Sequence, residues 1–240
     1  MKNLILIVAL LAAVSFVGCI DDDGSFGCTA GSGSVVEETF QISDFKGIKL
    51  DCSADIFVTQ GEEFSVIAES QANILDNLDL SLDGDILDID LVGCNRDFQL
   101  KLFITMPEVT FLKISGSGNI KGENLFTSEN LNLRVTGSGN MDLDLDYQSI
   151  NTKITGSGNM DLTGVCEEFD YTISGSGDIN SFGLISDRGF VKITGSGDTE
   201  VFVNEFLSVK ITGSGDVLFK GNPDEIVSDI TGSGDLRNVN

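Results

Sequence analysis

The sequence predicts an all-β protein: a right-handed parallel β-helix, or β-solenoid, with coils of about 19 residues and a less regular N-terminal β region that contains a hairpin. The main observation is a Gly-Ser-Gly phrase followed by Asn or Asp, repeated at intervals of 18 to 21 residues. A period held this closely is typical of repeat architectures. Apolar residues also alternate with polar ones around every copy, which is the pattern of half-buried strands. The phrase begins at Gly116, Gly137, Gly156, Gly175, Gly195, Gly213 and Gly232.

The clearest copy of the phrase runs from Ile193 to Thr199. If it is extended throughout, alternation places Ile193, both glycines and Thr199 on one side of the strand, and Thr194, Ser196 and Asp198 on the other. A unit of about 19 residues cannot bury its apolar side alone, so we expect the coils to stack in parallel at about 4.8 Å per coil. Parallel crossovers are right-handed in nearly all cases, which sets the expected hand.

Residues 35–110 are expected to form an irregular N-terminal β region, and residues 111–240 the repeated coils. Alternating apolar runs on both sides of Asp83-Gly84 predict a hairpin, because Asp and Gly tolerate the positive φ of a tight turn. Helical spacing occurs only in residues 71–78. The segment Lys49–Ile56 aligns with the repeated phrase, with Cys52 and Ala54 at the two glycine positions. This alignment predicts a degenerate coil with Cys52 pointing inward.

The first 18 residues are expected to be a lipoprotein signal peptide. Lys2 is followed by an apolar run too short to span a bilayer, and the run ends in Gly18-Cys19, which resembles the lipobox of bacterial lipoproteins. Cys19 is then the lipidation site and anchors the chain in the outer membrane. The alternative is an ordinary signal peptide with an incidental cysteine.

Residues 19–34 are expected to be an acidic Gly/Ser linker. Its Asp21-Asp22-Asp23 run resembles a surface-export signal of one group of gram-negative bacteria, although a solvated linker has the same composition. We expect the protein to be exposed on the cell surface, with the periplasmic face as the alternative.

Composition excludes several functions. The net charge of −24 opposes binding to phosphate backbones, so no nucleic-acid partner is expected. The absence of histidine removes the commonest general base and transition-metal ligand. Acidic residues are spread evenly by the repeat, whereas a glycoside-cleaving site needs a local asymmetric cluster. We therefore expect no enzyme activity and no cofactor.

Four cysteines remain after Cys19, namely Cys28, Cys52, Cys94 and Cys166. Outside the cytoplasm they allow up to two disulfides in three connectivities, and the sequence does not choose among these. A Cys52–Cys94 disulfide is possible if the hairpin folds over the end of the coil that contains Cys52.

The outward side chains of the phrases form the candidate ligand-facing ladder, in which regularly spaced hydroxyl, amide and carboxylate groups would recognise a repeating glycan. The alternative is a scaffold role, in which glycines allow close packing and the Ser, Asn and Asp side chains bond neighbouring coils. The ladder consists of Thr136, Ser138, Asn140, Thr155, Ser157, Asn159, Ser174, Ser176, Asp178, Thr194, Ser196, Asp198, Thr212, Ser214 and Asp216.

Calcium is a further alternative for the acidic members, because stacked carboxylates about 4.8 Å apart repel one another unless they fan out or share a cation. The candidate ligands are Asp178, Asp198, Asp216 and Asp235. The period of 19 residues differs from that of nonapeptide calcium coils, so no metal site is assigned.

The chain resembles the head GIN domain family, described as auto-transporter adhesins, over about residues 35–240. The resemblance rests on Phe45–Ile48, Ile56–Gly61, the Leu82–Ile89 hairpin, Met106-Pro107 and the serial Gly-Ser-Gly phrases. It implies a right-handed β-helix-like fold and an adhesin function, with no catalytic residues to transfer.

Together these features predict a non-catalytic cell-envelope lipoprotein, acting as a surface adhesin or binding module for a glycan or an extracellular protein. The alternatives are a structural spacer, a calcium-binding β-roll-like module and a carbohydrate-active β-helix enzyme. The chain continues only to Asn240 after its last phrase, without a capping helix, so self-association or a partner strand is expected at the C-terminal coil.

Overall fold

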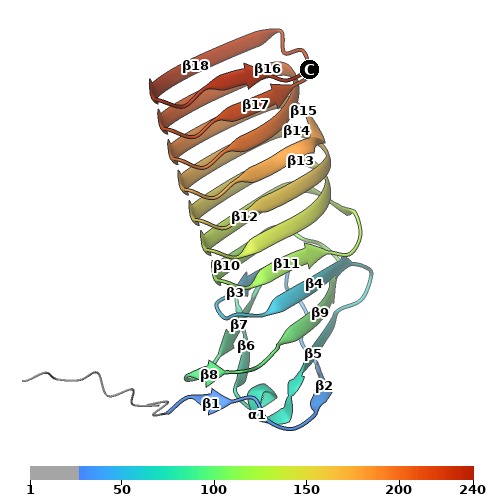
Figure 1. Cartoon of the computed structure of the whole chain (residues 1–240). Helices are drawn as coiled ribbons and strands as arrows, with labels where there is room; N and C mark the ends of the chain where they lie inside the picture. Colours follow the sequence, from blue (N-terminus) through green and yellow to red (C-terminus); the bar gives the residue numbers. More distant parts are fainter. Residues whose placement is uncertain (1–26) are drawn as a thin grey trace, which may run out of the picture.

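The computed structural model describes residues 27–240, which form a tall column of stacked β-coils with irregular strands at its N-terminal end (Figure 1). The expected signal peptide, Cys19 and the Asp21-Asp22-Asp23 run lie outside the described residues. The only helix among residues 27–240, α1 (Ala72–Leu75), is too short to cross a membrane. The N-terminal strands are β1 (Thr29–Ala30), β2 (Val35–Phe40), β3 (Gly47–Leu50), β4 (Asp55–Gln60), β5 (Ser65–Gln71), β6 (Leu78–Asp83), β7 (Ile86–Leu91), β8 (Asn95–Arg96) and β9 (Lys101–Met106). The strands of the column are β10 (Phe111–Gly116), β11 (Asn119–Gly122), β12 (Phe126–Gly137), β13 (Asn140–Gly156), β14 (Met160–Gly175), β15 (Ile179–Gly195), β16 (Thr199–Gly213), β17 (Val217–Lys220), β18 (Glu225–Gly232) and β19 (Leu236–Asn238).

The coils stack in parallel, and equivalent residues of each phrase lie directly over one another. Gly137 pairs with Gly156, and the same register continues through all seven phrases. The β-solenoid and its period of about 19 residues are therefore confirmed. Parallel pairing also satisfies most backbone groups of the inner coils, because each of their strands has a neighbour on both sides.

The interior of the column is filled by the inward residues of each coil. Ile154, Ile193 and Ile211 are fully buried, and so are Met141 and Met160 on the other side of the phrase. These columns of branched and flexible side chains form one continuous hydrophobic core along the column axis.

The phrase forms a corner and is not extended throughout. The prediction that its first glycine lies on the inward side together with Ile193 was therefore wrong. β13 ends at Gly156 and β14 begins only at Met160. The first glycines have φ between +124° and +136°, a conformation that L side chains rarely adopt. Gly156 is consequently half-exposed, whereas Gly158 is buried and Met160 points inward. Simple alternation fails here because the backbone turns at the first glycine.

The degenerate coil in the N-terminal region is confirmed by strand pairing. β3 pairs in parallel with β10, and β4 with β11, so that Lys49 lies beside Lys113 and Asp55 beside Asn119. Cys52 is 9% exposed and points inward as expected.

The expected hairpin is also confirmed. β6 and β7 are antiparallel, with Leu82 opposite Leu87 and Asp83 opposite Ile86, on either side of the turn at Gly84. The helical spacing in residues 71–78 yields only the single turn α1, whose Ile74 and Leu75 are buried.

Antiparallel strands close the N-terminal end of the core. β2 pairs with β5, and β5 pairs with β9, which continues the stack beneath β4. Phe45, Leu87 and Leu102 are fully buried here. The change from parallel to antiparallel pairing ends the column without exposing its interior.

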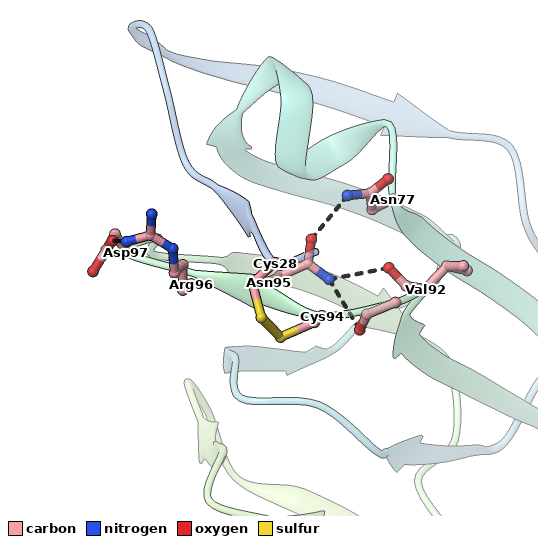
Figure 2. Close-up of a disulfide and its surroundings, with 8 residues drawn as sticks. Cys28, Asn77, Val92, Cys94, Asn95, Arg96 and Asp97 are labelled. Atoms are coloured by element: carbon pink, nitrogen blue, oxygen red, sulfur yellow. Dashed lines mark hydrogen bonds and ion pairs between the residues drawn. A yellow bond between two sulfur atoms is a disulfide. The ribbon is translucent and has the colours of Figure 1, made fainter. Parts of the chain in front are cut away.

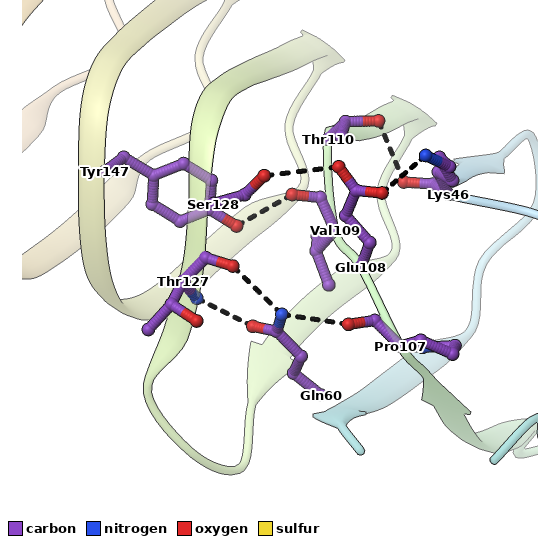
Figure 3. A network of polar contacts seen from close by, with 9 residues as sticks. All are labelled: Lys46, Gln60, Pro107, Glu108, Val109, Thr110, Thr127, Ser128 and Tyr147. Atoms are coloured by element: carbon purple, nitrogen blue, oxygen red, sulfur yellow. Dashed lines mark hydrogen bonds and ion pairs between the residues drawn. The ribbon is translucent and has the colours of Figure 1, made fainter. Parts of the chain in front are cut away.

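Polar contacts fasten this region to the first coils (Figure 3). The side-chain amide of Gln60 donates to the carbonyl oxygens of Pro107 and Thr127, at 3.0 Å each, and its oxygen accepts from the Thr127 N–H at 2.6 Å. The hydroxyl of Tyr147 donates to the Val109 carbonyl at 2.7 Å. Burial raises the pKa of Tyr147, so this hydroxyl keeps its proton. The connection that contains Pro107 is thereby held at both of its sides.

The disulfide joins Cys28 to Cys94, so the Cys52–Cys94 pairing that was considered possible is not formed (Figure 2). β1 pairs in parallel with β8, and the Thr29 N–H donates to the Cys94 carbonyl at 2.8 Å, which brings the preceding Cys28 beside Cys94. β1 lies within the segment that was expected to be a linker. Cys52 is buried in the interior of its own coil and is a free thiol. Cys166 is also a buried free thiol.

At the opposite end, the last coil has no strand above it among residues 27–240. β18 pairs with β16, and β19 pairs with β17. Every residue of β18 is exposed, including Ile226 and Ile230.

Candidate functional site

The Gly-Ser-Gly corner brings the expected ladder residues together along one edge of the column. The Ser between the two glycines of each phrase is exposed at this corner, as are Thr136, Thr155, Thr194 and Thr212. Ser174, Asn159, Asp178 and Asp216 are half-buried, whereas Asn140 and Asp198 are exposed. The parallel register aligns these groups in three columns, spaced by one coil.

The Asn and Asp side chains form what we call the Asx column, and each bonds to the next coil. The Asp198 N–H donates to Oδ1 of Asp178 at 2.7 Å, and the Asp216 N–H donates to Oδ1 of Asp198 at 2.7 Å. At the first coils the contacts run between side chains, as Asn140 donates through Nδ2 to Oδ1 of Asn119 at 3.0 Å. The full column consists of Asp55, Asn119, Asn140, Asn159, Asp178, Asp198, Asp216 and Asp235.

This geometry answers the question of how like charges can stack. One oxygen of each inner carboxylate accepts a backbone N–H, which is a charge-assisted hydrogen bond, and the other oxygen can turn to water. At the last coils Arg237 adds ion pairs to Asp216 at 2.5 Å and to Asp235 at 3.5 Å. Among residues 27–240, no group of three or more His, Cys, Asp or Glu side chains is placed to hold a metal ion.

We call the other two columns the hydroxyl columns, and their side chains are not used by the fold. The backbone N–H of the Ser between the two glycines donates to the carbonyl oxygen of the first glycine in the preceding coil, as Ser157 does to Gly137 at 2.8 Å. Their hydroxyl groups make no side-chain hydrogen bond to any residue in the range 27–240. The hydroxyl columns consist of Thr136, Thr155, Ser174, Thr194 and Thr212, and of Ser138, Ser157, Ser176, Ser196 and Ser214.

Replacing Asp198 by Ala is expected to lower the free energy of unfolding by about 1 kcal/mol, because the Asp216 N–H loses its acceptor. Asp198→Asn keeps the acceptor oxygen and should leave stability nearly unchanged. The matched control is Ser196→Ala in the same phrase, for which a change within about 0.5 kcal/mol is expected. Urea unfolding followed by circular dichroism measures all three. An equal loss for Asp198→Ala and Ser196→Ala would contradict the different roles of the two columns.

A second surface feature, which sequence reasoning missed, lies where strand pairing is interrupted at Gln148, Glu167 and Asp187. Two neighbouring depressions of about 460 and 480 Å³ share Gln148 and Glu167 in their walls. Arg188 lines the second, 3.3 Å from a Glu168 carboxylate oxygen. The only signal in the sequence was the recurrence of polar residues at this point of successive coils, and their identity varies too much to form a motif.

Arg188 is also packed against aromatic rings. Its guanidinium lies 5.3 Å from the ring centroid of Phe206 and 6.0 Å from that of Phe190. These cation–π contacts and the ion pair with Glu168 occupy the one basic group of the depression.

The two free thiols, Cys52 and Cys166, are expected to be unreactive at neutral pH. Burial, with help from nearby carboxylates, raises the pKa of Cys52 and of Cys166 to about 12. Since the thiolate is the nucleophile and metal ligand, neither residue is poised for covalent or metal chemistry at neutral pH.

The fold and its corner define a β-solenoid that displays repeated polar side chains along a straight edge. The chain belongs to the family described as "Putative auto-transporter adhesin, head GIN domain", which it matches over residues 44–223. The family resemblance inferred from the sequence is thus confirmed. A comparison with curated proteins gave no match.

Several solved structures are similar to the chain in fold. A putative adhesin from Bacteroides fragilis is 22% identical with a TM-score of 0.83, and the match covers 88% of this chain and 99% of that one. A putative adhesin from Parabacteroides merdae is 22% identical with a TM-score of 0.72, covering 89% and 100%. A protein from Parabacteroides distasonis described as a putative lipid binding protein is 23% identical with a TM-score of 0.75, covering 88% and 99%.

Membership of an adhesin family fits a non-catalytic binding role and indicates a protein of the cell surface or envelope. At these identities the solved structures establish the fold alone.

Proposed function

We propose that the protein is a lipid-anchored adhesin of the outer membrane, exposed on the cell surface, whose solenoid binds a glycan or an extracellular protein through the hydroxyl columns. The observation that carries the ligand-binding part is the free state of these hydroxyls. They are solvent-facing, repeat at one coil spacing of about 4.8 Å, and are not needed for hydrogen bonds within residues 27–240.

Hydroxyl groups at regular intervals suit a neutral, repeating ligand. A hydroxyl donates and accepts, so it can pair with sugar hydroxyls or with a peptide backbone. The surrounding charge favours the same choice, because a chain of net charge −24 repels polyanions. The Asx column then serves as the support that holds the hydroxyl columns in line.

Binding of the full-length chain to glycan and extracellular-matrix protein arrays tests the ligand. We expect a signal that Ser157→Ala/Ser196→Ala reduces at least about 5-fold, since each lost ligand hydrogen bond is worth about 0.5–1.5 kcal/mol. The matched control is Ser34→Ala/Ser81→Ala, which removes two exposed hydroxyls from the N-terminal region. No signal on either array would favour a structural spacer, and equal loss in both variants would place the ligand elsewhere.

The anchoring part of the proposal rests on the Gly18-Cys19 sequence and on the acidic residues that follow it. Protease treatment of intact cells tests the exposed side of the membrane: the proposal expects the chain to be degraded. Protection in intact cells and degradation after permeabilisation would instead indicate the periplasmic face.

A further inference from the structure

The C-terminal end of the column is an open strand edge. β18 uses one side to pair with β16, and no strand within residues 27–240 pairs in register with the other side. An unpaired edge presents a row of N–H and C=O groups that can accept a further strand. In the N-terminal region the corresponding end is closed by antiparallel strands and by α1.

The open edge also leaves the end of the hydrophobic core uncovered. Ile226, Ser228 and Ile230 lie in register with Leu207, Val209 and Ile211, which are at most 2% exposed and face the interior. Ile226 and Ile230 face the same interior, yet they are 44% and 38% exposed because no further coil lies above them.

We propose that a second copy of this chain covers this end, through antiparallel pairing of the two β18 strands about a two-fold axis at Ser228. The inward residues of β18 read Ile-Ser-Ile, which is the same in both directions about Ser228. In this register Ile226 of each copy faces Ile230 of the other, and the two Ser228 side chains face each other. A two-fold interface requires self-complementarity of this kind.

The charges on the outer face are compatible with the same register. Val227 of one copy faces Asp229 of the other, and Glu225 faces Thr231, so no two carboxylates lie directly opposite. Stacking of one copy's C-terminal end onto another's N-terminal end is disfavoured, because the latter is closed and its Ile74 and Leu75 are already buried. The acidic character of both copies opposes association at low salt, so pairing should strengthen as salt increases.

Cysteine trapping of the full-length chain tests the pairing at its axis. Directly opposed residues of antiparallel strands have Cβ atoms about 4.5–5.5 Å apart, close to the separation in a disulfide. Ser228→Cys should therefore form a covalent dimer on mild oxidation, seen on a non-reducing gel. Ser138→Cys, an exposed serine in the column, is the matched control and should remain monomeric. Equal trapping at both positions, or none at either, would overturn the proposal.

A charge exchange at the same position separates self-pairing from capture of another protein's strand. Ser228→Asp and Ser228→Lys each place like charges on the axis, so each should dimerise at least about 10-fold more weakly than the parent chain in sedimentation velocity. An equimolar mixture should recover the dimer, because Asp then faces Lys. Failure of the mixture to recover it, or a parent chain that is monomeric at high salt, would reject the two-fold dimer. Neither experiment depends on the ligand of the hydroxyl columns.

Discussion

Gly175→Ala is expected to lower the free energy of unfolding by about 3–5 kcal/mol, one of the largest effects of a single methyl group in this chain. Two costs combine at this corner. Gly175 has a φ of +134°, and a Cβ there would lie 2.2 Å from the carbonyl oxygen of Gly156 in the preceding coil. The neighbouring atom belongs to the backbone of a stacked coil, so it cannot move away without separating the two coils.

The neighbouring positions provide the control and a second variant. Ser176→Ala alters an exposed hydroxyl and should change stability by no more than about 0.5 kcal/mol. Gly177→Ala lacks the positive φ but would bring a Cβ to 2.1 Å from the Gly158 carbonyl oxygen, so it should also be strongly destabilising. Urea unfolding gives the three values. A Gly175→Ala protein as stable as Ser176→Ala would show that the coils are not stacked through these glycines.

Removal of the disulfide by Cys28→Ser/Cys94→Ser is expected to cost about 2–4 kcal/mol. The bond closes a loop of 66 residues, and its loss increases the conformational freedom of the unfolded chain. It also releases β1 from β8 at the edge of the N-terminal region (Figure 2).

A reducing agent provides an independent measurement. Dithiothreitol should lower the melting temperature of the parent chain and leave that of the double variant unchanged. Cys52→Ala is the matched control, because this free thiol should contribute only through packing, at about 1 kcal/mol. A Cys52→Ala protein that loses its response to dithiothreitol would restore the Cys52–Cys94 pairing.

The fold was predictable because the repeat constrains the same positions many times. Seven phrases with one period determine both the parallel stack and the register, and the register then identifies Lys49–Ile56 as a further coil. The hairpin at Asp83-Gly84 was predictable from local turn chemistry alone.

The predictions that failed concern features that the periodicity of the sequence does not reveal. Alternation treats every residue as extended, whereas the first glycine of each phrase has a positive φ and turns the chain. The disulfide was missed because its first cysteine precedes a strand of two residues, β1, in a Gly-rich stretch without alternation. Pairing of so short a strand depends on β8, which is distant in sequence.

The candidate site was predictable in position and only partly in role. The sequence places Ser196 and Asp198 on the outside, but it does not reveal that Asp198 bonds to the next coil while Ser196 bonds to none with its side chain. That difference depends on how closely each side chain approaches the backbone of the adjacent coil, and the amino-acid sequence alone does not give this distance.

The two ends of the described chain lie at opposite ends of the column, with Cys28 beside the irregular strands and β18 at the far end (Figure 1). With the anchor at Cys19 that we propose, nine residues before Cys28, β18 lies at the end of the column opposite the anchored end. If two copies pair through β18 as we propose, their anchored ends lie at the two outer ends of the pair. Such a pair would allow a single kind of molecule, present on both sides, to bridge two neighbouring cells.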